Sequence, residues 1–290
     1  MRIAHISDFH LPNKPGQKVN GVFPDANLSE AVAVLKKQIP KPDLIILGGD
    51  LLEDGQKGDY EPISELFKDF QVPLHTVVGN HDDLKTLKQS SLLEKGNDYP
   101  GYGSFDHGKI HVILLHSSGT GKPPGNLDEQ QLLWLSEDLS VNHGKPVLIF
   151  MHHPPIDSDV PWLDKIKLAN ADAFWKILPP YSKNILGVFF SHLHIQLSTV
   201  IRGVLVASPP AICFQFSGNS DASKEELSAE QPGFNLIDVK DWSVRVRTVR
   251  FAPPASETAA RHAAASDSAA NTKQAAGSRP GHEHNPGARK

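Results

Sequence analysis

The sequence lacks most features that mark secreted or membrane-spanning proteins. It has a single cysteine, Cys213, in 290 residues, so an internal disulfide is excluded and a reducing compartment is favoured. No apolar run approaches the roughly 18 to 20 residues that a membrane span needs. Strand-like residues begin at Arg2, and no basic and apolar leader precedes them. We therefore expect a cytoplasmic protein with no membrane span.

The chain also lacks a strong charge of either sign. Its formal net charge is −4, and hydrophobic and charged residues make up 39% and 21% of the sequence. This balance is typical of a globular protein, and it gives no electrostatic reason to expect a nucleic acid or a membrane surface as partner. Because Cys213 has no metal-binding or redox pattern around it in the sequence, we expect it to be a small buried apolar residue.

The first eighty residues alternate between strand and helix patterns. Apolar periodicity predicts strands over residues 2–7, 44–47 and 74–78, with helices over 27–39 and 60–70. The run Asn27-Leu28-Ser29-Glu30 is typical of a capping box that opens the first helix. Strands that are apolar throughout are typical of a parallel sheet with both faces covered.

The rest of the chain predicts shorter strands, one helix and a final segment of low complexity. The strands fall at 103–106, 109–115, 147–151, 185–190, 204–207 and 244–249, and the helix at 128–139. The long irregular segment 154–170 is typical of a lid over a functional site. Arg245 and Arg247 share one face of the last strand, which we expect to face solvent. Because large apolar residues are rare beyond it, we predict one domain over 1–251 and a disordered tail over 252–290.

Polar residues of a few types follow the predicted strands. They are Asp8, His10, Asp50, Asn80, His81, His152, His192 and His194. Each lies just after an apolar segment, and functional groups of α/β sheets collect at these carboxyl ends. Carboxylate oxygen, amide oxygen and imidazole nitrogen are ligands of Mn, Fe and Zn, and two ions that share one carboxylate account for a set of this size. In extended chain, residues i and i+2 face the same way, which is the reason we expect Asp8 to act with His10 and His192 to act with His194.

Single residues of these types have simpler explanations. Asp8 or Asp50 alone could cap a helix, and Asn80 could stabilise its own turn. A lone histidine is usually a satisfied core or surface residue, and this is our interpretation of His5, His75, His107, His111, His116, His143, His262, His282 and His284. These explanations give no reason for four further histidines to follow strands, so a metal site is favoured.

Taken together, the motifs resemble those of a known family. The series Asp8-x-His10, Gly49-Asp50, Gly79-Asn80-His81-Asp82, His152 and His192-x-His194 is similar to that of the calcineurin-like metallophosphoesterase superfamily, over roughly residues 1–250. The run Met151-His152-His153-Pro154-Pro155 most resembles class III cyclic nucleotide phosphodiesterases and bacterial glycerophosphodiesterases. Two positions depart from the family pattern: relatives usually have glycine at Ser191 and often have aspartate at His116.

The resemblance implies a fold and a set of roles. The implied fold is α/β, a four-layer αββα sandwich of two mixed β-sheets flanked by helices. Two metal ions (Fe, Mn or Zn) would bind at the strand ends, with Asp50 as bridging ligand. One ion would be held by Asp8, His10 and His194, and the other by Asn80, His152 and His192. His81 would be the catalytic histidine, and Asn80 and His81 would contact the substrate.

The resemblance also implies hydrolysis of a phosphodiester by a hydroxide that the two ions activate. His81, kept cationic by Asp82, by Asp83 or by the phosphate, would protonate the leaving alkoxide. The favoured substrates are 3',5'-cyclic nucleotides, ahead of glycerophosphodiesters, and packing is favoured over base stacking for Trp162 and Phe214. The alternatives are a phosphomonoesterase, a non-catalytic scaffold, and a nuclease, which the charge balance disfavours. The expected partner is a small phosphodiester, and a homodimer is left open.

Overall fold

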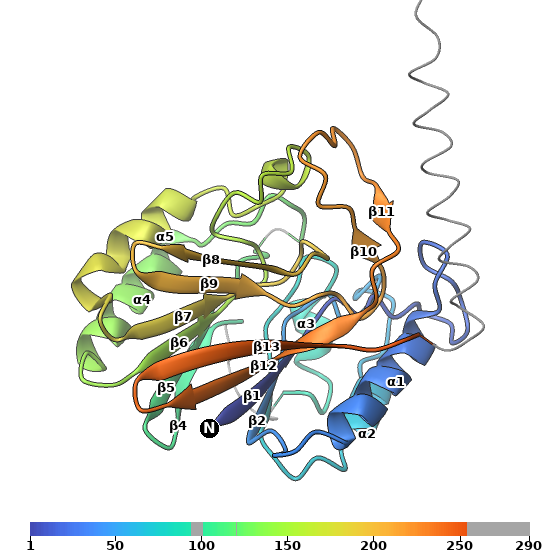
Figure 1. Ribbon diagram of the computed structural model, residues 1–290, viewed down its shortest axis with the longest axis horizontal. Coiled ribbons are helices and arrows are strands. Elements are labelled where there is room, and N and C mark those ends of the chain that lie inside the picture. Colours follow the sequence, from blue (N-terminus) through green and yellow to red (C-terminus); the bar gives the residue numbers. More distant parts are fainter. Residues whose placement is uncertain (94–100, 120, 254–290) are drawn as a thin grey trace, which may run out of the picture.

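Two stacked β-sheets form the centre of the molecule, and helices lie on the outer side of each (Figure 1). The computed structural model describes residues 1–93, 101–119 and 121–253. The first sheet has the strand order β13 (Ser243–Arg250), β12 (Gly233–Lys240), β1 (Arg2–Ile6), β2 (Leu44–Leu47) and β3 (Leu74–Thr76). The second has the order β4 (Gly103–His107), β5 (Ile110–Leu114), β6 (Val147–Phe150), β7 (Ile185–Phe189), β9 (Val204–Ser208) and β8 (Leu197–Ile201). A separate two-stranded ribbon joins β10 (Gln215–Phe216) to β11 (Leu227–Ser228).

Both large sheets mix parallel and antiparallel pairs. In the first sheet β1, β2 and β3 run parallel, while β12 pairs antiparallel with β1 and with β13. In the second sheet β5, β6, β7 and β9 run parallel, and the edge strands β4 and β8 are antiparallel to their neighbours. The parallel strands therefore bring several carboxyl ends to one side of the sandwich.

The helices are α1 (Pro24–Lys36), α2 (Glu61–Phe67), α3 (Leu84–Leu87), α4 (Glu129–Val141) and α5 (Ala171–Ile177), with the short 3-10 turns η1 (Leu163–Lys165) and η2 (Pro179–Tyr181). Apolar residues of α1 and α2 pack on the outer face of the first sheet, and those of α4 and α5 pack on the second. A third apolar cluster lies between the sheets, where Ile46 of β2 packs in one layer with Phe150 of β6 and Phe189 of β7. The predicted four-layer αββα sandwich is confirmed.

The predicted β-α-β-α-β order of the first eighty residues is confirmed, but the start of the first helix was predicted wrongly. Helix α1 begins at Pro24, a residue suited to the first helical turn because it has no N–H to leave unpaired. Asn27 lies inside the helix, where its buried amide nitrogen donates to the Cys213 carbonyl (3.2 Å). The capping box is therefore absent, because tertiary packing uses the side chain that was expected to cap.

Other boundaries differ by a few residues. Helix α2 ends at Phe67 instead of residue 70, and a turn follows in which the Phe70 N–H donates to the Phe67 carbonyl (3.0 Å). Strand β3 ends at Thr76, although the Val77 N–H still donates to the Leu47 carbonyl (2.8 Å) before the chain turns toward the site. These deviations shorten the elements without changing their order.

Two further expectations concern the chain as a whole. Within the described residues, no helix is both long enough and apolar enough to cross a membrane. Residues 254–290, which hold most of the predicted tail as well as His262, His282 and His284, lie outside the described residues. The division into a domain over 1–251 and a tail thus stays a prediction.

Candidate metal centre

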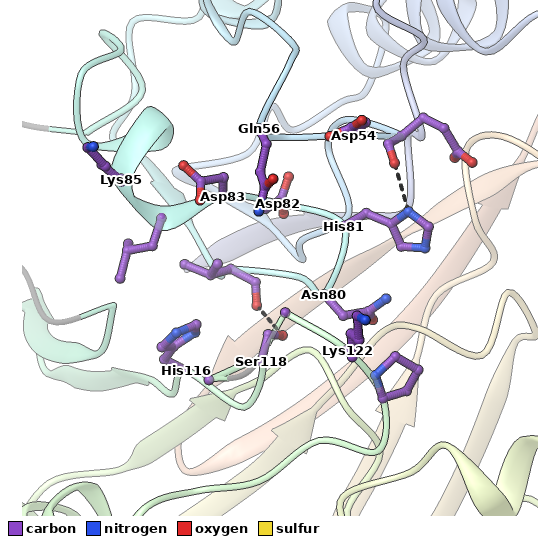
Figure 2. A pocket seen from close by; sticks show the side chains of 16 residues that line it. Asp54, Gln56, Asn80, His81, Asp82, Asp83, Lys85, His116, Ser118 and Lys122 are labelled. Atoms are coloured by element: carbon purple, nitrogen blue, oxygen red, sulfur yellow. Dashed lines mark hydrogen bonds between the residues drawn. The ribbon is translucent and has the colours of Figure 1, made fainter.

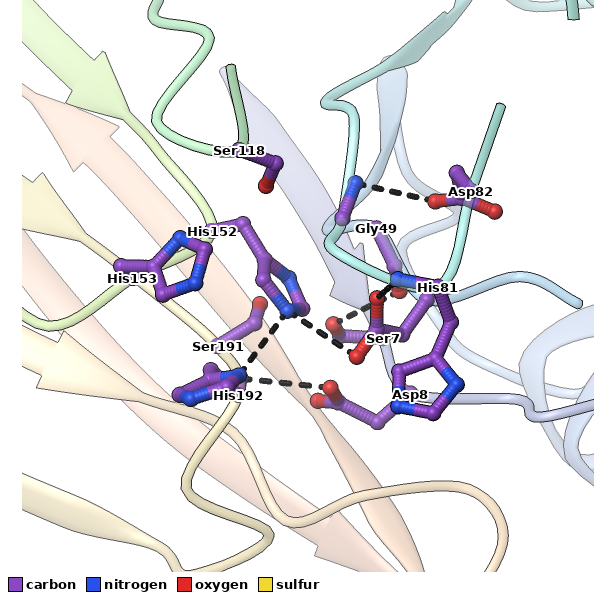
Figure 3. A network of polar contacts seen from close by, with 12 residues as sticks. Ser7, Asp8, Gly49, His81, Asp82, Ser118, His152, His153, Ser191 and His192 are labelled. Carbon is purple, nitrogen blue, oxygen red and sulfur yellow. Dashed lines mark hydrogen bonds and ion pairs between the residues drawn. The ribbon is translucent and has the colours of Figure 1, made fainter. Parts of the chain in front are cut away.

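The polar residues predicted to act together follow strands of both sheets. Asp8, Asp50 and Asn80 come after β1, β2 and β3 of the first sheet, while His152 comes after β6 of the second. His192 and His194 follow β7, and all the side chains named so far are buried. Figure 3 shows Asp8, His152 and His192 pointing toward one another. Stacking of the two sheets thus brings residues together that are up to 186 positions apart in the sequence, because the carboxyl ends of their parallel strands open on the same side.

Five of these residues have left-handed backbone. They are Asp8 (φ 57°), His10 (φ 48°), Asp50 (φ 51°), His192 (φ 71°) and His194 (φ 51°). Residues other than glycine rarely adopt this conformation, and it concentrates at functional sites. The extended i, i+2 geometry expected for Asp8 with His10, and for His192 with His194, was wrong, because β1 ends at Ile6 and β7 at Phe189 and all four residues have left-handed backbone beyond those strands.

Asp50 is the carboxylate on which the others converge. Its Oδ2 lies 3.1 Å from Nε2 of His152 and 3.7 Å from Nε2 of His10. Potential ligand atoms of Asp8, His10 and Asp50 lie within 4.8 Å of one another, and so do those of Asp50, His152 and His192. Asp50 therefore belongs to both groups, as a bridging ligand would.

His194 completes the cluster on the side of His10. Its Nε2 lies 3.1 Å from Nε2 of His10 and 3.7 Å from an oxygen of Asp8. On the other side, Nδ1 of His192 lies 3.3 Å from Nε2 of His152. Ring nitrogens that face one another at such distances share a hydrogen or a cation, because two bare lone pairs repel.

Glycines allow the two carboxyl ends of β2 and β3 to touch. A Cβ atom on Gly79 would lie 2.1 Å from both the backbone nitrogen and Oδ1 of Asp50. Gly49 has φ 94°, and a Cβ there would lie 2.7 Å from the Gly79 nitrogen and from Nδ1 of His152. A side chain at Gly79 would displace Asp50, and a side chain at Gly49 would displace Gly79 or His152. Steric crowding therefore explains why glycine precedes both Asp50 and Asn80.

Buried atoms without partners indicate what the cluster could hold. Oδ2 of Asp8 and Oδ1 of Asn80 are buried acceptors with no hydrogen-bond partner among the described residues. A buried acceptor without a partner costs free energy, and a bound cation would satisfy both oxygens. Together with the imidazole nitrogens, this donor set fits borderline divalent metals.

Burial and neighbouring charge separate the pKa values of the cluster. Burial raises the pKa of Asp8 to about 6. For Asp50 burial acts in the same direction, but His152 and His10 outweigh it and hold its pKa well below the usual value. Burial, reinforced by positive neighbours, lowers the pKa of His192 and of His194 well below the ordinary value. Both rings are therefore neutral at pH 7, which is the form that binds a metal.

Each of three histidines is oriented through the nitrogen that faces away from the cluster. Nδ1 of His152 contacts the Gly48 carbonyl (2.8 Å), and Nδ1 of His194 contacts the Phe214 carbonyl (2.9 Å). Nδ1 of His10 contacts the Glu53 carboxylate instead (2.7 Å). Because these acceptors hold a hydrogen on Nδ1, Nε2 is the nitrogen of each ring that faces the cluster.

His81 lies beside the cluster. Its backbone N–H donates to Oδ1 of Asp50 (2.8 Å), and its Nδ1 contacts the Glu53 carbonyl (2.9 Å). Asp82 and Asp83, two of the three groups expected to keep His81 cationic, have other hydrogen-bond partners in the structure. Asp82 is buried and accepts hydrogen bonds from the backbone of Gly79 and Leu51 and from the Tyr60 hydroxyl, so it holds the turn together. Asp83 caps α3 by accepting from the backbone N–H of Thr86 (2.8 Å).

A cavity of about 580 Å³ opens beside Asn80 and His81. Figure 2 shows both residues on its wall together with Ser118 and Lys122. His116 also lines this cavity, and its buried Nδ1 has no hydrogen-bond partner among the described residues, so the expectation of a satisfied histidine was wrong there. The cavity provides room for the part of a substrate that lies beyond its phosphate.

Ser191, the other residue that departs from the family pattern, is accommodated by the packing around it. Ser191 is buried, and its hydroxyl lies 3.4 Å from Nε2 of His5. A Cβ atom on Gly48 would come within 2.3 Å of the Ser191 hydroxyl oxygen, so the missing side chain of that glycine leaves the space for it. His5 is buried between the sheets against Phe150, but its Nδ1 lacks a partner among the described residues, so it too is not fully satisfied.

Three residues that contact the cluster were not predicted from the sequence to do so. His153 is buried with its ring 4.5 Å from that of His192, and its Nδ1 contacts the Ser117 hydroxyl (2.9 Å). Cys213 is buried, as expected, but its sulfur lies 3.7 Å from Nδ1 of His194. In the sequence, only its position three residues after Asp50 distinguishes Glu53. Its contact with His10 arises only in the folded chain.

The remaining predictions concern residues away from the cluster. His75 stacks on Phe105, His111 lies between two carboxylates and His143 is exposed on the surface, so their structural interpretation is confirmed. Phe214 packs on the His194 ring (4.5 Å), and Trp162 packs edge-to-face on Phe216 (4.8 Å). Both aromatic rings thus make packing contacts, and the preference for packing over base stacking stays a prediction. Arg245 and Arg247 are exposed, as predicted.

Comparisons with known proteins agree with this geometry. The family model described as calcineurin-like phosphoesterase matches residues 1–196. The chain is 28% identical over 259 residues to a Nostoc sp. protein named 3',5'-cyclic-nucleotide phosphodiesterase, covering 88% of this chain and 95% of the relative. It is 30% identical over 251 residues to an Arcobacter nitrofigilis protein named probable glycerophosphodiester phosphodiesterase, covering 81% and 88%. A dimetal phosphatase from Danio rerio has the same fold, with a TM-score of 0.62, 15% identity and coverage of 87% of this chain and 99% of that one.

Proposed function

Because the chain belongs to the calcineurin-like phosphoesterase family, we propose that it is a phosphodiesterase that uses two metal ions to hydrolyse 3',5'-cyclic nucleotides. The observation that carries the proposal is the position of Asp50. Its carboxylate belongs to two groups of ligand atoms at once, one with Asp8 and His10 and the other with His152 and His192. A single structural ion needs no shared carboxylate between two such groups.

The ligand roles follow from the same geometry. Asp8, His10 and His194 would hold one ion, and Asn80, His152 and His192 would hold the other, with Asp50 shared. The unpaired oxygens of Asp8 and Asn80 support the inclusion of one oxygen ligand in each set. When bound, the ions supply positive charge that activates a water and neutralises charge developing on the phosphoryl oxygens. Fe, Mn and Zn all suit these ligands.

His81 is suited to donate a proton to the leaving oxygen. The Glu53 carbonyl can only accept a hydrogen bond, so the hydrogen of the neutral His81 ring resides on Nδ1. Nε2 is then the nitrogen that gains and loses the second proton. Protonation of the leaving alkoxide by such a group accelerates cleavage by about 10²–10⁴-fold. Neighbouring Asn80 would contact the phosphate together with His81.

The names of the relatives support the choice of cyclic nucleotides, whereas the residues that line the cavity favour the second candidate substrate. The Nostoc relative is named for cyclic nucleotides, which makes them the first candidate. Glycerophosphodiesters are the second candidate, favoured by the name of the Arcobacter relative. The cavity beside Asn80 also favours them, because no Phe, Tyr or Trp is among the described residues that line it and a polar group would suit it better than a stacked base.

A panel of substrates tests the proposal. Protein freed of metal and reloaded with Mn²⁺, Zn²⁺ or Fe²⁺ is assayed with cyclic AMP, cyclic GMP, glycerophosphocholine, bis(4-nitrophenyl) phosphate and 4-nitrophenyl phosphate. We expect diesters to be cleaved with a higher kcat/KM than the monoester, with the cyclic nucleotides first. A preference for the monoester would identify a phosphomonoesterase. Protein that binds no metal and cleaves none of the five compounds would identify a scaffold and overturn the proposal.

A further inference from the structure

We propose that a hollow at the end of the sandwich opposite the candidate metal centre binds a nucleoside monophosphate, with its base stacked on Trp242 and its phosphate held by Lys109 and Lys240. The hollow has a volume of about 700 Å³, against about 580 Å³ for the cavity beside Asn80 and His81. Sites for small ligands usually have volumes of about 300–1,000 Å³. The inference stands apart from the proposed function, although hydrolysis of a 3',5'-cyclic nucleotide would release such a ligand.

The hollow lies between the tips of two hairpins, one from each large sheet. The turn between β4 and β5 and the turn between β12 and β13 both line it, and both lie at the lower left of Figure 1, where β1 begins. Met1 and Pro146 also line it and directly precede the parallel strands β1 and β6, whose other ends lead to Asp8 and His152. From Met1 to Asp8 the chain advances seven residues, which span roughly 20 Å when extended. A ligand in the hollow would therefore be well separated from the metal centre.

Trp242 lies at the tip of the β12–β13 hairpin in a backbone conformation that is unusual for its residue type. The strand pairing ends at Lys240 and Ser243, so Asp241 and Trp242 form a two-residue turn in which both have left-handed backbone (φ 48° and 63°). Such turns favour Asn and Gly, because a bulky residue at positive φ is strained. Trp242 is 54% exposed, and its ring makes no aromatic or cation–π contact among the described residues. Contacts within the chain therefore do not account for an indole here, and strained residues concentrate where ligands bind.

Two lysines of the hollow have ammonium groups without a partner. Lys109 lies in the turn between β4 and β5, and Lys240 is the last residue of β12. Both are exposed, and neither ammonium group makes a hydrogen bond or an ion pair among the described residues. The ammonium group of Lys145, which also lines the hollow, is already paired with Asp106 (2.6 Å). A phosphate monoester carries close to two negative charges at pH 7, which the two unpaired ammonium groups would balance.

The buried part of the lining is apolar. Pro146 and Val239 are buried there, and Ile110 is half-buried. These residues form a floor on which a nucleoside can rest, while the exposed indole offers a flat aromatic face to its base. Aromatic stacking combined with basic side chains that contact phosphate is the means by which proteins bind nucleotides without hydrogen bonds that identify the base.

Two other occupants fit the hollow less well. A second copy of this chain would dock through a two-fold interface, which places the same surface of each copy against the other. Lys109 and Lys240 would then meet a surface of their own charge. A membrane surface would require an exposed apolar patch beside the basic groups, whereas Pro146 and Val239 are buried and only Trp242 is a large exposed apolar residue among those that line the hollow.

NMR of the indole N–H groups measures binding in this hollow without a signal from the metal centre. The chain has four tryptophans, and the signal of Trp242 is the one that disappears in Trp242→Gly. We expect 5'-AMP to shift the Trp242 signal saturably and to leave the signals of Trp134 and Trp175 in place. Adenosine and inorganic phosphate each supply only part of the ligand, so both should bind at least about 10-fold more weakly than 5'-AMP.

Trp242→Gly separates binding from stability. Glycine adopts left-handed backbone without strain, so we expect the thermal midpoint of this variant to equal or exceed that of the wild type. Its affinity for 5'-AMP should fall by about 10–100-fold, because the stacking surface is lost. The backbone N–H signals of Gly108 and Gly144, which also line the hollow, measure that affinity in the wild type and in the variant alike.

Charge variants test the phosphate contact. Lys109→Ala combined with Lys240→Ala should lower the affinity for 5'-AMP by about 10-fold or more, because both cations are removed. The matched control is Lys37→Ala combined with Lys41→Ala, which removes two exposed lysines outside the hollow and should bind 5'-AMP as the wild type does. Asp241→Asn removes the acidic residue of the lining, and asparagine tolerates left-handed backbone, so this variant should bind 5'-AMP more tightly.

Each remaining outcome decides the proposal. A Trp242 signal that does not move in millimolar 5'-AMP would overturn it, and so would equal binding of 5'-AMP and inorganic phosphate that persists in Trp242→Gly. Without a response to 5'-AMP, a dimer that Trp242→Gly converts to a monomer in sedimentation would assign the hollow to a second copy. Loss of binding to phosphatidylserine vesicles in that variant would assign it to a membrane. A response to 5'-AMP in a protein that cleaves no cyclic nucleotide would support this site while the proposed function fails.

Discussion

At the scale of single residues, the centre depends on backbone conformations that most side chains avoid. Left-handed backbone at residues such as Asp50 and His194 costs about 1–3 kcal/mol each when it is strained. Hydrogen bonds to the surrounding chain offset this free-energy cost, because they hold the left-handed residues in place. The Asp50 carbonyl, for instance, accepts from the N–H groups of both Phe9 and His10.

The chemistry of His81 can be tested by its removal. His81 is held beside the cluster through Asp50 and Glu53 but belongs to neither group of ligand atoms around Asp50. We expect His81→Ala to keep both ions, measured by elemental analysis, and to lose about 10²–10⁴-fold in kcat for an alkoxide leaving group. The loss should be much smaller for 4-nitrophenolate, which leaves without a proton. An equal loss for both leaving groups would remove His81 from the role of acid.

At the scale of elements, the second sheet is joined to helix α4 by a buried histidine between two carboxylates. Nδ1 of His111 on β5 lies 2.7 Å from Asp106 of β4, and its Nε2 lies 2.7 Å from Asp138 of α4. Lys145 approaches the other oxygen of Asp106 (2.6 Å). Burial alone would lower the pKa of His111, but the hydrogen bonds to Asp138 and Asp106 outweigh it and raise that pKa above the ordinary value.

This arrangement predicts a pH-dependent contribution to stability. Because the pKa of His111 is higher in the folded protein than in the unfolded chain, its contribution is complete below about pH 6.5 and is lost as the pH rises through the raised value. We expect His111→Gln to lower the free energy of unfolding by about 1–3 kcal/mol near pH 6 and by less near pH 9. Urea unfolding at several pH values measures the difference.

The control for that experiment is an exposed histidine. His143 contacts the Ser140 carbonyl at the end of α4, and His143→Gln should change the free energy of unfolding by less than about 0.5 kcal/mol at every pH. If His111→Gln destabilised the protein equally at low and high pH, the charge on His111 would play no part in joining the sheet to the helix.

At the scale of the whole molecule, the centre would tie the two sheets together. The first sheet supplies Asp8, Asp50 and Asn80, and the second supplies His152 and His192. Without a cation, Asp8 and Asn80 each leave a buried oxygen without a partner among the described residues. Ions bound at this junction would stabilise the folded state and not the unfolded chain, in which the ligands are far apart.

Metal removal should therefore lower the stability of the whole fold. We expect chelation to lower the thermal midpoint, and re-addition of Mn²⁺ at about 100 times its dissociation constant to restore about 2.7 kcal/mol per site. Differential scanning calorimetry measures the shift. Asp50→Ala is the matched control, since loss of the shared ligand should abolish both metal binding and the metal-dependent shift. An unchanged midpoint in the chelated wild type would contradict a metal-linked fold.

The order of the strands and the identity of the residues after them were determined by the sequence itself. The apolar run 44–47 forms a buried strand, and the left-handed backbone of Gly49 (φ 94°) then redirects the chain just before Asp50. These are local properties, because periodicity and the conformational range of glycine act over a few residues. For this reason the β-α-β-α-β order could be predicted from the residues, whereas the four layers were implied by the resemblance to a known family.

The contacts that orient the site were decided only by the tertiary structure. Glu53 meets His10 because two loops run side by side, and Asn27 meets Cys213 instead of capping its helix. Asp82 was one of three groups expected to keep His81 cationic, yet in the folded chain its carboxylate accepts a hydrogen bond from the Tyr60 hydroxyl. Local periodicity carries no information on such pairs, because the distance between two side chains far apart in sequence depends on how the sheets and loops pack together.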